Sequence, residues 1–288
     1  MAEAPRLKPM MSTEILDAAF RLYRSNFVTF LGIFAVIYVP ITLVVIAVSG
    51  HFYSQAQASI LGAADAATRA AAERDLQVIQ GGLTIMEALL YALIAVPLAT
   101  GALTCAVGMR YLNEPASIGK AYRQIFPLFF KYFGTTLLSG LVTGLGFMFC
   151  LVPGFLFMTW FFATTSIVCL EGKGGTAAMG RSRDLVRGFG GRIFGFLILT
   201  SMLQGVLVGP VSVAAEFLLP LITESFALRF ALSTVLQQLL GMIITPFFSA
   251  VLVLLYYDLR IRKEAFDLEV LARNLGKAPP PETAPAQP

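Results

Sequence analysis

The sequence has few residues that can carry chemistry or face water. Among 288 residues there are one histidine, three cysteines and one tryptophan, and 13% are Asp, Glu, Lys or Arg. Because His51 is the only histidine, a His-based metal site, a catalytic triad and a histidine proton relay each lack a second member. The charged fraction is about half that of soluble domains, which excludes a water-exposed exterior. We therefore predict no catalytic residue, no cofactor and no metal ligand.

The cysteines lie within apolar segments. Cys105, Cys150 and Cys169 form no CxxC pair and have no histidine nearby. This pattern is typical of small apolar packing residues and disfavours redox chemistry or metal binding.

Long hydrophobic runs dominate the rest of the chain, with a mean hydropathy of +0.77 and 57% hydrophobic residues. A hydrocarbon layer of about 30 Å needs about 20 apolar residues in a helix. The runs are continuously apolar and do not alternate, which favours helices over a barrel. The sequence predicts an all-α polytopic membrane bundle with six spans, near residues 27–48, 83–109, 128–150, 154–170, 193–215 and 230–257.

Three regions follow from this pattern. We expect an N-terminal tail at 1–11, a membrane domain at 12–275 and a disordered Pro-rich tail at 276–288. The periodicity of 261–275 predicts a helix after the last span. His51 is expected in an exterior loop after the first span, and the Ala-rich stretch 55–79 predicts an exterior helix that extends the second span.

Basic residues predict the orientation. With both termini in the cytoplasm, eighteen Lys and Arg residues fall inside and only Arg69, Arg74 and Arg229 fall outside. This positive-inside asymmetry predicts a multi-pass protein of the cytoplasmic (inner) membrane. We expect membrane lipids as partners and no nucleic acid, since no soluble module combines clustered basic and aromatic residues.

Short amphipathic helices are predicted before three pairs of spans, at 12–26, at 117–127 and at 176–188. They suggest three copies of an interfacial-helix-plus-hairpin unit. The alternative is unrelated basic connectors, which any membrane hairpin protein has.

Counting along the helices places the remaining charges by depth. Glu87 lies roughly 34 Å from Arg110, and Glu216 lies roughly 36 Å from Arg192, so both glutamates belong near the outer headgroups. Arg229 falls at the same boundary. No acid or base is left in the hydrocarbon centre, which disfavours a proton relay or a charged ion pathway.

Five residues reach mid-depth: Pro40, Pro97, Gln204, Thr245 and Pro246. Proline in a span frees a backbone carbonyl, so the three kinks with Gln204 and Thr245 could surround a small polar cavity. The alternative is that the kinks only help the helices to pack.

Small-residue motifs are concentrated in the third and fifth spans. They predict close helix packing within the bundle or, alternatively, homodimerisation. The GxxxG pairs are Gly140 with Gly144, Gly191 with Gly195, and Gly205 with Gly209.

Two short motifs at span ends carry a family resemblance. They are Glu171 followed by Ala177-Ala178, Arg181-Ser182 and Leu185, and the run Tyr256-Tyr257-Asp258-Leu259-Arg260. With them, residues 12–275 resemble the membrane domain associated with bacterial glycerophosphoryl diester phosphodiesterases and the six-helix inner-membrane proteins grouped with it. The resemblance implies the membrane half of such proteins without their soluble catalytic domain.

The function predicted from these observations is that of a non-enzymatic scaffold or accessory protein that binds lipid or a membrane-protein partner. Its contact residues would lie in two basic clusters, and the alternative for them is orientation alone. A transporter or channel for a small neutral or amphiphilic solute is the second candidate, and an enzyme acting on lipids is the third. The clusters are Arg181, Arg183 and Arg187, and Arg260, Arg262 and Lys263.

Overall fold

The computed structural model describes residues 9–266 and residue 268, and within them every regular element is a helix. A π-helical turn, η1 (Tyr91–Ala95), joins α3 to α4, and a 3₁₀ turn, η2 (Phe126–Leu128), joins α5 to α6. The α-helices are α1 (Ser12–Ser25), α2 (Phe27–Leu61), α3 (Ala66–Leu90), α4 (Val96–Tyr111), α5 (Ile118–Ile125), α6 (Phe129–Phe149), α7 (Leu151–Trp160), α8 (Thr164–Glu171), α9 (Gly175–Val186), α10 (Gly190–Ile222) and α11 (Phe226–Glu264).

In the part of the chain that the structure describes, six helical segments are long and apolar enough to cross a membrane, as predicted. Several run past the apolar stretches that predicted them. The first continues to Leu61, so that His51 lies within helix α2, and the prediction of a loop there was wrong. A helix satisfies its backbone hydrogen bonds internally in lipid and in water alike, so it need not end where the apolar run ends. The fourth segment, Leu151–Glu171, consists of the two short helices α7 and α8.

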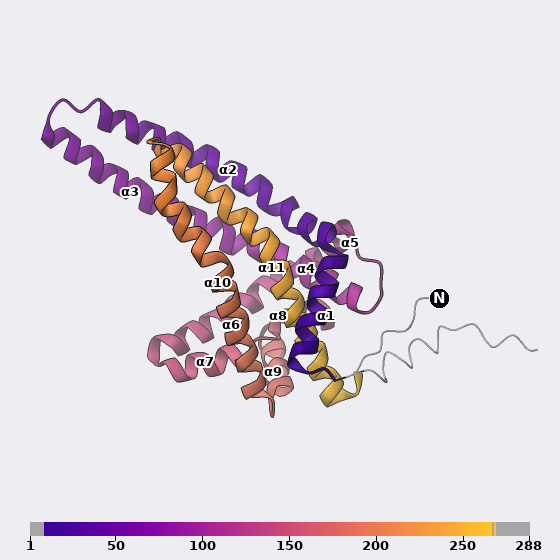
Figure 1. Cartoon of the computed structure of the whole chain (residues 1–288). Coiled ribbons are helices and arrows are strands. Elements are labelled where there is room, and N and C mark those ends of the chain that lie inside the picture. Colours follow the sequence, from indigo (N-terminus) through magenta and orange to yellow (C-terminus); the bar gives the residue numbers. More distant parts are fainter. Residues whose placement is uncertain (1–8, 267, 269–288) are drawn as a thin grey trace, which may run out of the picture.

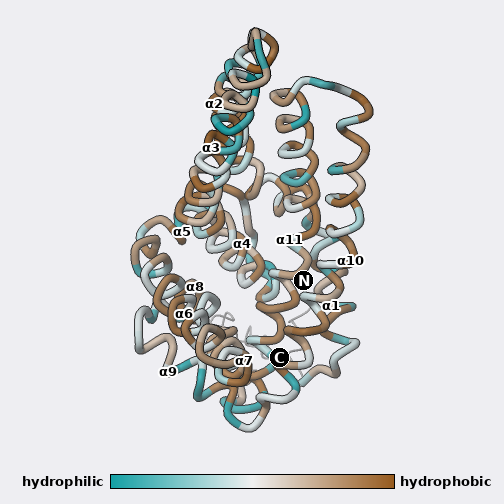
Figure 2. Tube along the Cα trace, turned by 90° about the vertical axis from the view of Figure 1, so that its left-hand side faces the viewer, coloured by the Kyte–Doolittle hydropathy of each residue, from teal (hydrophilic) through white to brown (hydrophobic). Residues whose placement is uncertain are grey.

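The helices form two lobes that diverge from a common base (Figure 1). Helices α2, α3, α10 and α11 extend together, while α6 and α7 form a second hairpin that points away from them. Helices α1, α5, α8 and α9 gather at the base. We call the end of the protein where these four helices gather the basal end. The opposite end, which contains the turns at 62–65 and 223–225, is the distal end. Hydrophilic residues gather toward the distal tip of α2 and α3 (Figure 2).

The main core fills the basal half of the protein. Helix α4 and the second half of α11 lie at its centre, and most of their residues are buried. Small residues on α4 allow this close packing. A Cβ added at Gly101 would lie 2.8 Å from Cγ1 of Ile125, and one at Gly108 would lie 2.5 Å from Cδ2 of Leu170.

A smaller core at the distal end joins the hairpin of α2 and α3 to the start of α11. Its buried residues are Tyr53 and Ala56 of α2 and Leu76 and Leu83 of α3. Phe226 and Phe230 at the start of α11 pack against them.

The GxxxG glycines do not mediate packing within the described chain. A Cβ built on any of the six would have no neighbour within 4 Å, so the prediction of bundle packing through them was wrong. Sequence spacing shows that such residues share a helix face, but it does not show which way that face points. Homodimerisation through these faces stays a prediction.

The last long helix ends where Ala265 adopts a left-handed backbone with φ of 50°. The predicted helix at 261–275 is therefore interrupted near its start, and its later residues Ala272 and Leu275 lie outside the described residues. The Pro-rich tail at 276–288 and residues 1–8 of the N-terminal tail also lie outside them.

Candidate functional site

Several basic residues predicted to contact lipid are held by carboxylates within the basal end. Arg181 donates through Nη2 to Oε2 of Glu264 at 2.7 Å and through Nε to Oε2 of Glu171 at 3.2 Å. Tyr256 donates to the same Glu171 at 2.8 Å, and Arg260 donates to Glu264 at 3.2 Å. The hydrogen bonds to Glu264 and Glu171 raise the pKa of Arg181 above its usual value. This cluster ties α8, α9 and α11 together.

A second basal cluster surrounds Asp258, whose side chain is fully buried on α11. Its oxygens accept hydrogen bonds from the backbone N–H of Met10 at 2.7 Å and from Nε of Arg262 at 2.8 Å, and Arg192 approaches at 2.9 Å. Both arginines also donate to the carbonyl of Met10 at 2.7 Å. The cluster therefore fixes the chain before α1 against the end of α11.

The remaining predicted contact residues differ in their surroundings. Arg183 lies 4.5 Å above the ring of Trp160, and Lys263 donates to the backbone carbonyl of Asp184. Arg187 is exposed, and its side chain forms no ion pair with any residue that the structure describes. Intramolecular contacts thus account for most of the six residues, whereas Arg187 is exposed without an ionic partner among the described residues.

The five mid-depth residues differ in how far they are exposed. Pro40 and Gln204 are exposed on α2 and α10, whereas Pro97 and Pro246 are buried and Thr245 is half-buried. The sequence determines how deep such residues lie along a helix, whereas the packing of the helices determines the direction in which they face.

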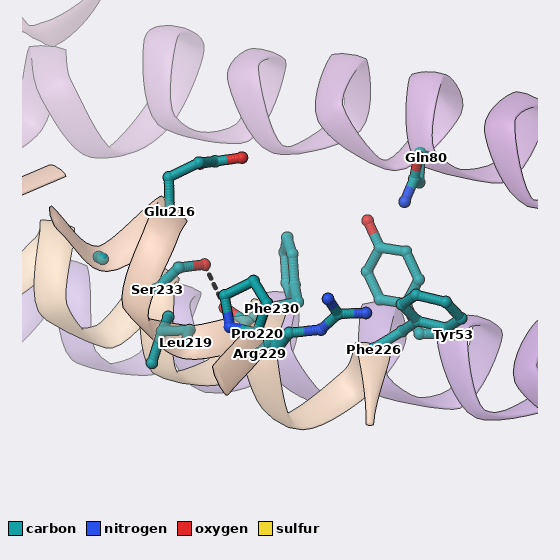
Figure 3. A pocket seen from close by; sticks show the side chains of 10 residues that line it. Tyr53, Gln80, Glu216, Leu219, Pro220, Phe226, Arg229, Phe230 and Ser233 are labelled. Carbon is teal, nitrogen blue, oxygen red and sulfur yellow. Dashed lines mark hydrogen bonds between the residues drawn. The ribbon is translucent and has the colours of Figure 1, made fainter. Parts of the chain in front are cut away.

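A cavity that the sequence did not predict lies at the distal end, between the α2–α3 hairpin and the α10–α11 hairpin. Its volume is about 280 Å³. Figure 3 shows polar side chains from all four helices around it. The lining residues are Tyr53, Gln80, Ala215, Glu216, Leu219, Pro220, Phe226, Arg229, Phe230 and Ser233.

Opposite charges face this cavity without forming an ion pair. Glu216 lies on α10 and Arg229 on α11, and no salt bridge joins either of them to another described residue. The guanidinium of Arg229 lies 4.6 Å from the ring centre of Phe226, a cation–π distance. Ser233 donates to the carbonyl of Phe230 at 2.9 Å. The site therefore presents one cation and one anion beside an apolar, aromatic wall.

Gln57 on α2 holds the two sides of the cavity together. Its Oε1 accepts the backbone N–H of Phe226 at 3.2 Å, and its Nε2 donates to the carbonyl of Glu224 at 3.5 Å. Ser225 caps α11 by accepting the N–H of Leu228 at 3.4 Å. These contacts position the start of α11, and with it Arg229.

The cavity lies about one bilayer thickness from the basal arginines. At 1.5 Å per residue, Arg229 lies roughly 46 Å from Arg260 along α11, and Gln80 lies roughly 45 Å from Arg110 along α3 and α4. A bilayer with its headgroup layers is about 40–45 Å thick. The sequence predicted this depth for Glu216 and Arg229, but not that Tyr53, Gln80, Phe226 and Ser233 meet them there.

Comparison with known proteins gives no match: no family model, no curated protein and no solved structure matches this chain.

Proposed function

We propose that this protein is a non-enzymatic accessory protein of the bacterial inner membrane that binds the head group of a zwitterionic phospholipid in the distal cavity. The supporting observation is the cavity itself, in which Arg229 and Glu216 face the same space and neither has an ionic partner among the described residues. The positive-inside pattern supports a cytoplasmic basal end, and with that orientation the cavity lies at the outer leaflet.

The chemistry of the lining suits a phosphoethanolamine group. The guanidinium of Arg229 donates to a phosphate, and the carboxylate of Glu216 accepts from an ammonium. The aromatic rings of Tyr53, Phe226 and Phe230 add an apolar wall that also attracts a cation. Drug-sized ligands occupy cavities of about 300–1,000 Å³, so a cavity of about 280 Å³ suits a head group whose acyl chains remain in the membrane.

Binding is favoured over transport because the helices α4 and α11 are tightly packed on the basal side of the cavity. Leu103, Val107, Leu254 and Leu255 of α4 and α11 are fully buried in the basal half. The two carboxylate clusters then join the helices that surround this core. A passage for solute would require this packed half to open, whereas head-group binding requires only the distal end.

The test is lipid binding by the delipidated full-length protein in detergent micelles. We expect dioctanoyl phosphatidylethanolamine to bind more tightly than dioctanoyl phosphatidylglycerol in isothermal titration calorimetry. Arg229→Gln should weaken the binding of both lipids at least about tenfold, because it removes the phosphate partner. Glu216→Gln should remove the preference for ethanolamine and leave the binding of phosphatidylglycerol unchanged or tighter.

Matched controls come from an exposed ion pair on α3, in which Nε of Arg69 lies 3.2 Å from Oε1 of Glu73. Arg69→Gln and Glu73→Gln make the same charge changes on the same side of the protein, outside the cavity. Both should bind like the parent. Parental affinity in Arg229→Gln, or an unchanged lipid preference in Glu216→Gln, contradicts the proposal.

A further inference from the structure

A second cavity lies at the basal end, where α1 crosses the end of α4 and the second half of α11. Its volume is about 350 Å³. It contains two arginines and no carboxylate. Residues from three segments line it, among them Arg21, Leu22, Ser25, Arg110, Tyr111 and Asn113.

The two arginines of this cavity have no carboxylate partner among the described residues. Neither Arg21 nor Arg110 forms an ion pair with any residue in the described part of the chain. At the same end of the protein, Arg181, Arg192 and Arg262 each have a carboxylate oxygen within 3.2 Å. Among the described residues, Arg181, Arg192 and Arg262 are thus neutralised, whereas half-buried Arg110 and exposed Arg21 are not.

The guanidinium of Arg110 is held in place, but one of its N–H groups has no hydrogen-bond acceptor among the described residues. Its Nη2 donates to the carbonyl of Ala116 at 3.0 Å, which fixes the guanidinium at the end of α4. Its Nε is buried and has no hydrogen-bond partner among the described residues. A half-buried cation without a counter-charge is costly, and an anion in the adjoining cavity reduces that cost.

The turn after α4 satisfies some of the backbone carbonyls at the end of that helix. Asn113 adopts a left-handed conformation with φ of 59°, which turns the chain back on itself. The N–H of Glu114 then bonds the carbonyl of Met109 at 2.8 Å, and that of Leu112 bonds the carbonyl of Gly108 at 3.2 Å. The negative end of the helix is therefore partly satisfied internally.

We propose that this basal cavity binds a phosphate group through Arg21 and Arg110. Guanidinium groups pair with phosphate in a forked geometry, and two of them on different segments can grip one phosphate from two sides. Bound phosphate would join α1 to α4, which meet at this cavity. The phosphate comes either from a phospholipid of the adjacent leaflet or from a soluble phosphate compound.

Two probes distinguish these sources: inorganic phosphate and dioctanoyl phosphatidic acid, each titrated into the delipidated full-length protein in a phosphate-free buffer. Binding of the lipid alone assigns the site to a lipid head group, and binding of inorganic phosphate alone assigns it to a soluble compound. Arg21→Gln should weaken the binding of the active probe about tenfold. Arg21 is exposed at the rim of the cavity, so this variant should fold.

Arg24→Gln is the matched control, because Arg24 is an exposed arginine on the same helix outside the cavity lining. It should change affinity less than twofold. Arg110→Lys provides a second test. It keeps the positive charge but cannot form the bidentate hydrogen bonds of a guanidinium, so it should weaken binding without abolishing it. If neither probe binds, or if Arg21→Gln and Arg24→Gln weaken binding equally, the proposal is wrong.

Discussion

The basal and distal ends of the same long helices are built in opposite ways. At the basal end, one fully buried carboxylate, Asp258, holds Met10, Arg192 and Arg262, and the surrounding residues of α11 are almost all buried. At the distal end, Glu216 and Arg229 face a cavity without pairing. From this difference we predict that contacts at the basal end contribute more to the stability of the fold than contacts at the distal end.

The largest effect should come from Asp258→Ala. The substitution leaves two arginines and the N–H of Met10 without their common acceptor, and removing one partner of a buried ion pair costs about 3–5 kcal/mol. Thermal denaturation in detergent should show a strongly lowered midpoint. Asp184→Ala is the control, because Lys263 binds its backbone carbonyl and not its exposed side chain. If the two variants were equally stable, the basal end would not be the stabilising end.

A pair of glycine substitutions should separate packed helices from open ones. Gly101→Leu places a Cβ 2.8 Å from Cγ1 of Ile125 in the basal core, and overpacking of this kind costs about 1–3 kcal/mol. A Cβ added at Gly205 on α10 has no neighbour within 4 Å, so Gly205→Leu should be neutral or stabilising by up to about 1 kcal/mol. The thermal denaturation midpoints of the two variants, each compared with that of the parent, measure these changes in stability. A loss of stability in Gly205→Leu would instead indicate that α10 touches a second copy of the chain.

The basal arginines should divide into structural and accessible ones. Arg181→Gln breaks the bonds to Glu171 and Glu264 and should cost about 1–2 kcal/mol of stability. Arg187→Gln should leave stability within about 0.5 kcal/mol, because the exposed side chain has no ionic partner among the described residues. Binding to anionic liposomes should fall only for Arg187→Gln. Equal liposome binding by Arg187→Gln and the parent would contradict a role of Arg187 in head-group binding.

The smallest effect should come from Gln57→Ala at the distal end. It removes the acceptor of the Phe226 N–H and should cost about 1 kcal/mol. Hydrogen exchange of the Phe226 amide should become faster, while the amides of α4 keep their protection. Gln55→Ala, on the same helix, is the control and should leave the Phe226 amide unchanged. If exchange also became faster in α4, the two ends would not be independent.

The six spans could be predicted because length and apolarity are local properties of a segment. The depths of Glu216 and Arg229 could be calculated for the same reason, since a helix rises by a fixed amount per residue. The partners of those residues could not be predicted. Gln57 and Phe226 are far apart in the sequence, and neither is charged, so no local pattern marks them as neighbours.

Asp258 lies within the Tyr256–Arg260 run, and the residues of that run do not indicate its role. The structure shows that this aspartate anchors the N-terminal segment, a contact between opposite ends of the chain. The basic clusters were predicted from charge alone, and charge does not distinguish an arginine that holds a buried carboxylate from one that faces lipid.

By itself, the sequence determined six helical segments long and apolar enough to cross a membrane among the described residues, and how far along each helix the polar residues lie. Hydrophobicity and helical rise both act within a segment. The tertiary structure decided which faces meet. It closed the basal half around small residues and paired charges, left the GxxxG faces open, and brought Arg229 and Glu216 to one cavity. The rotation of each helix about its axis depends on the packing of all the others, so a single segment does not encode it.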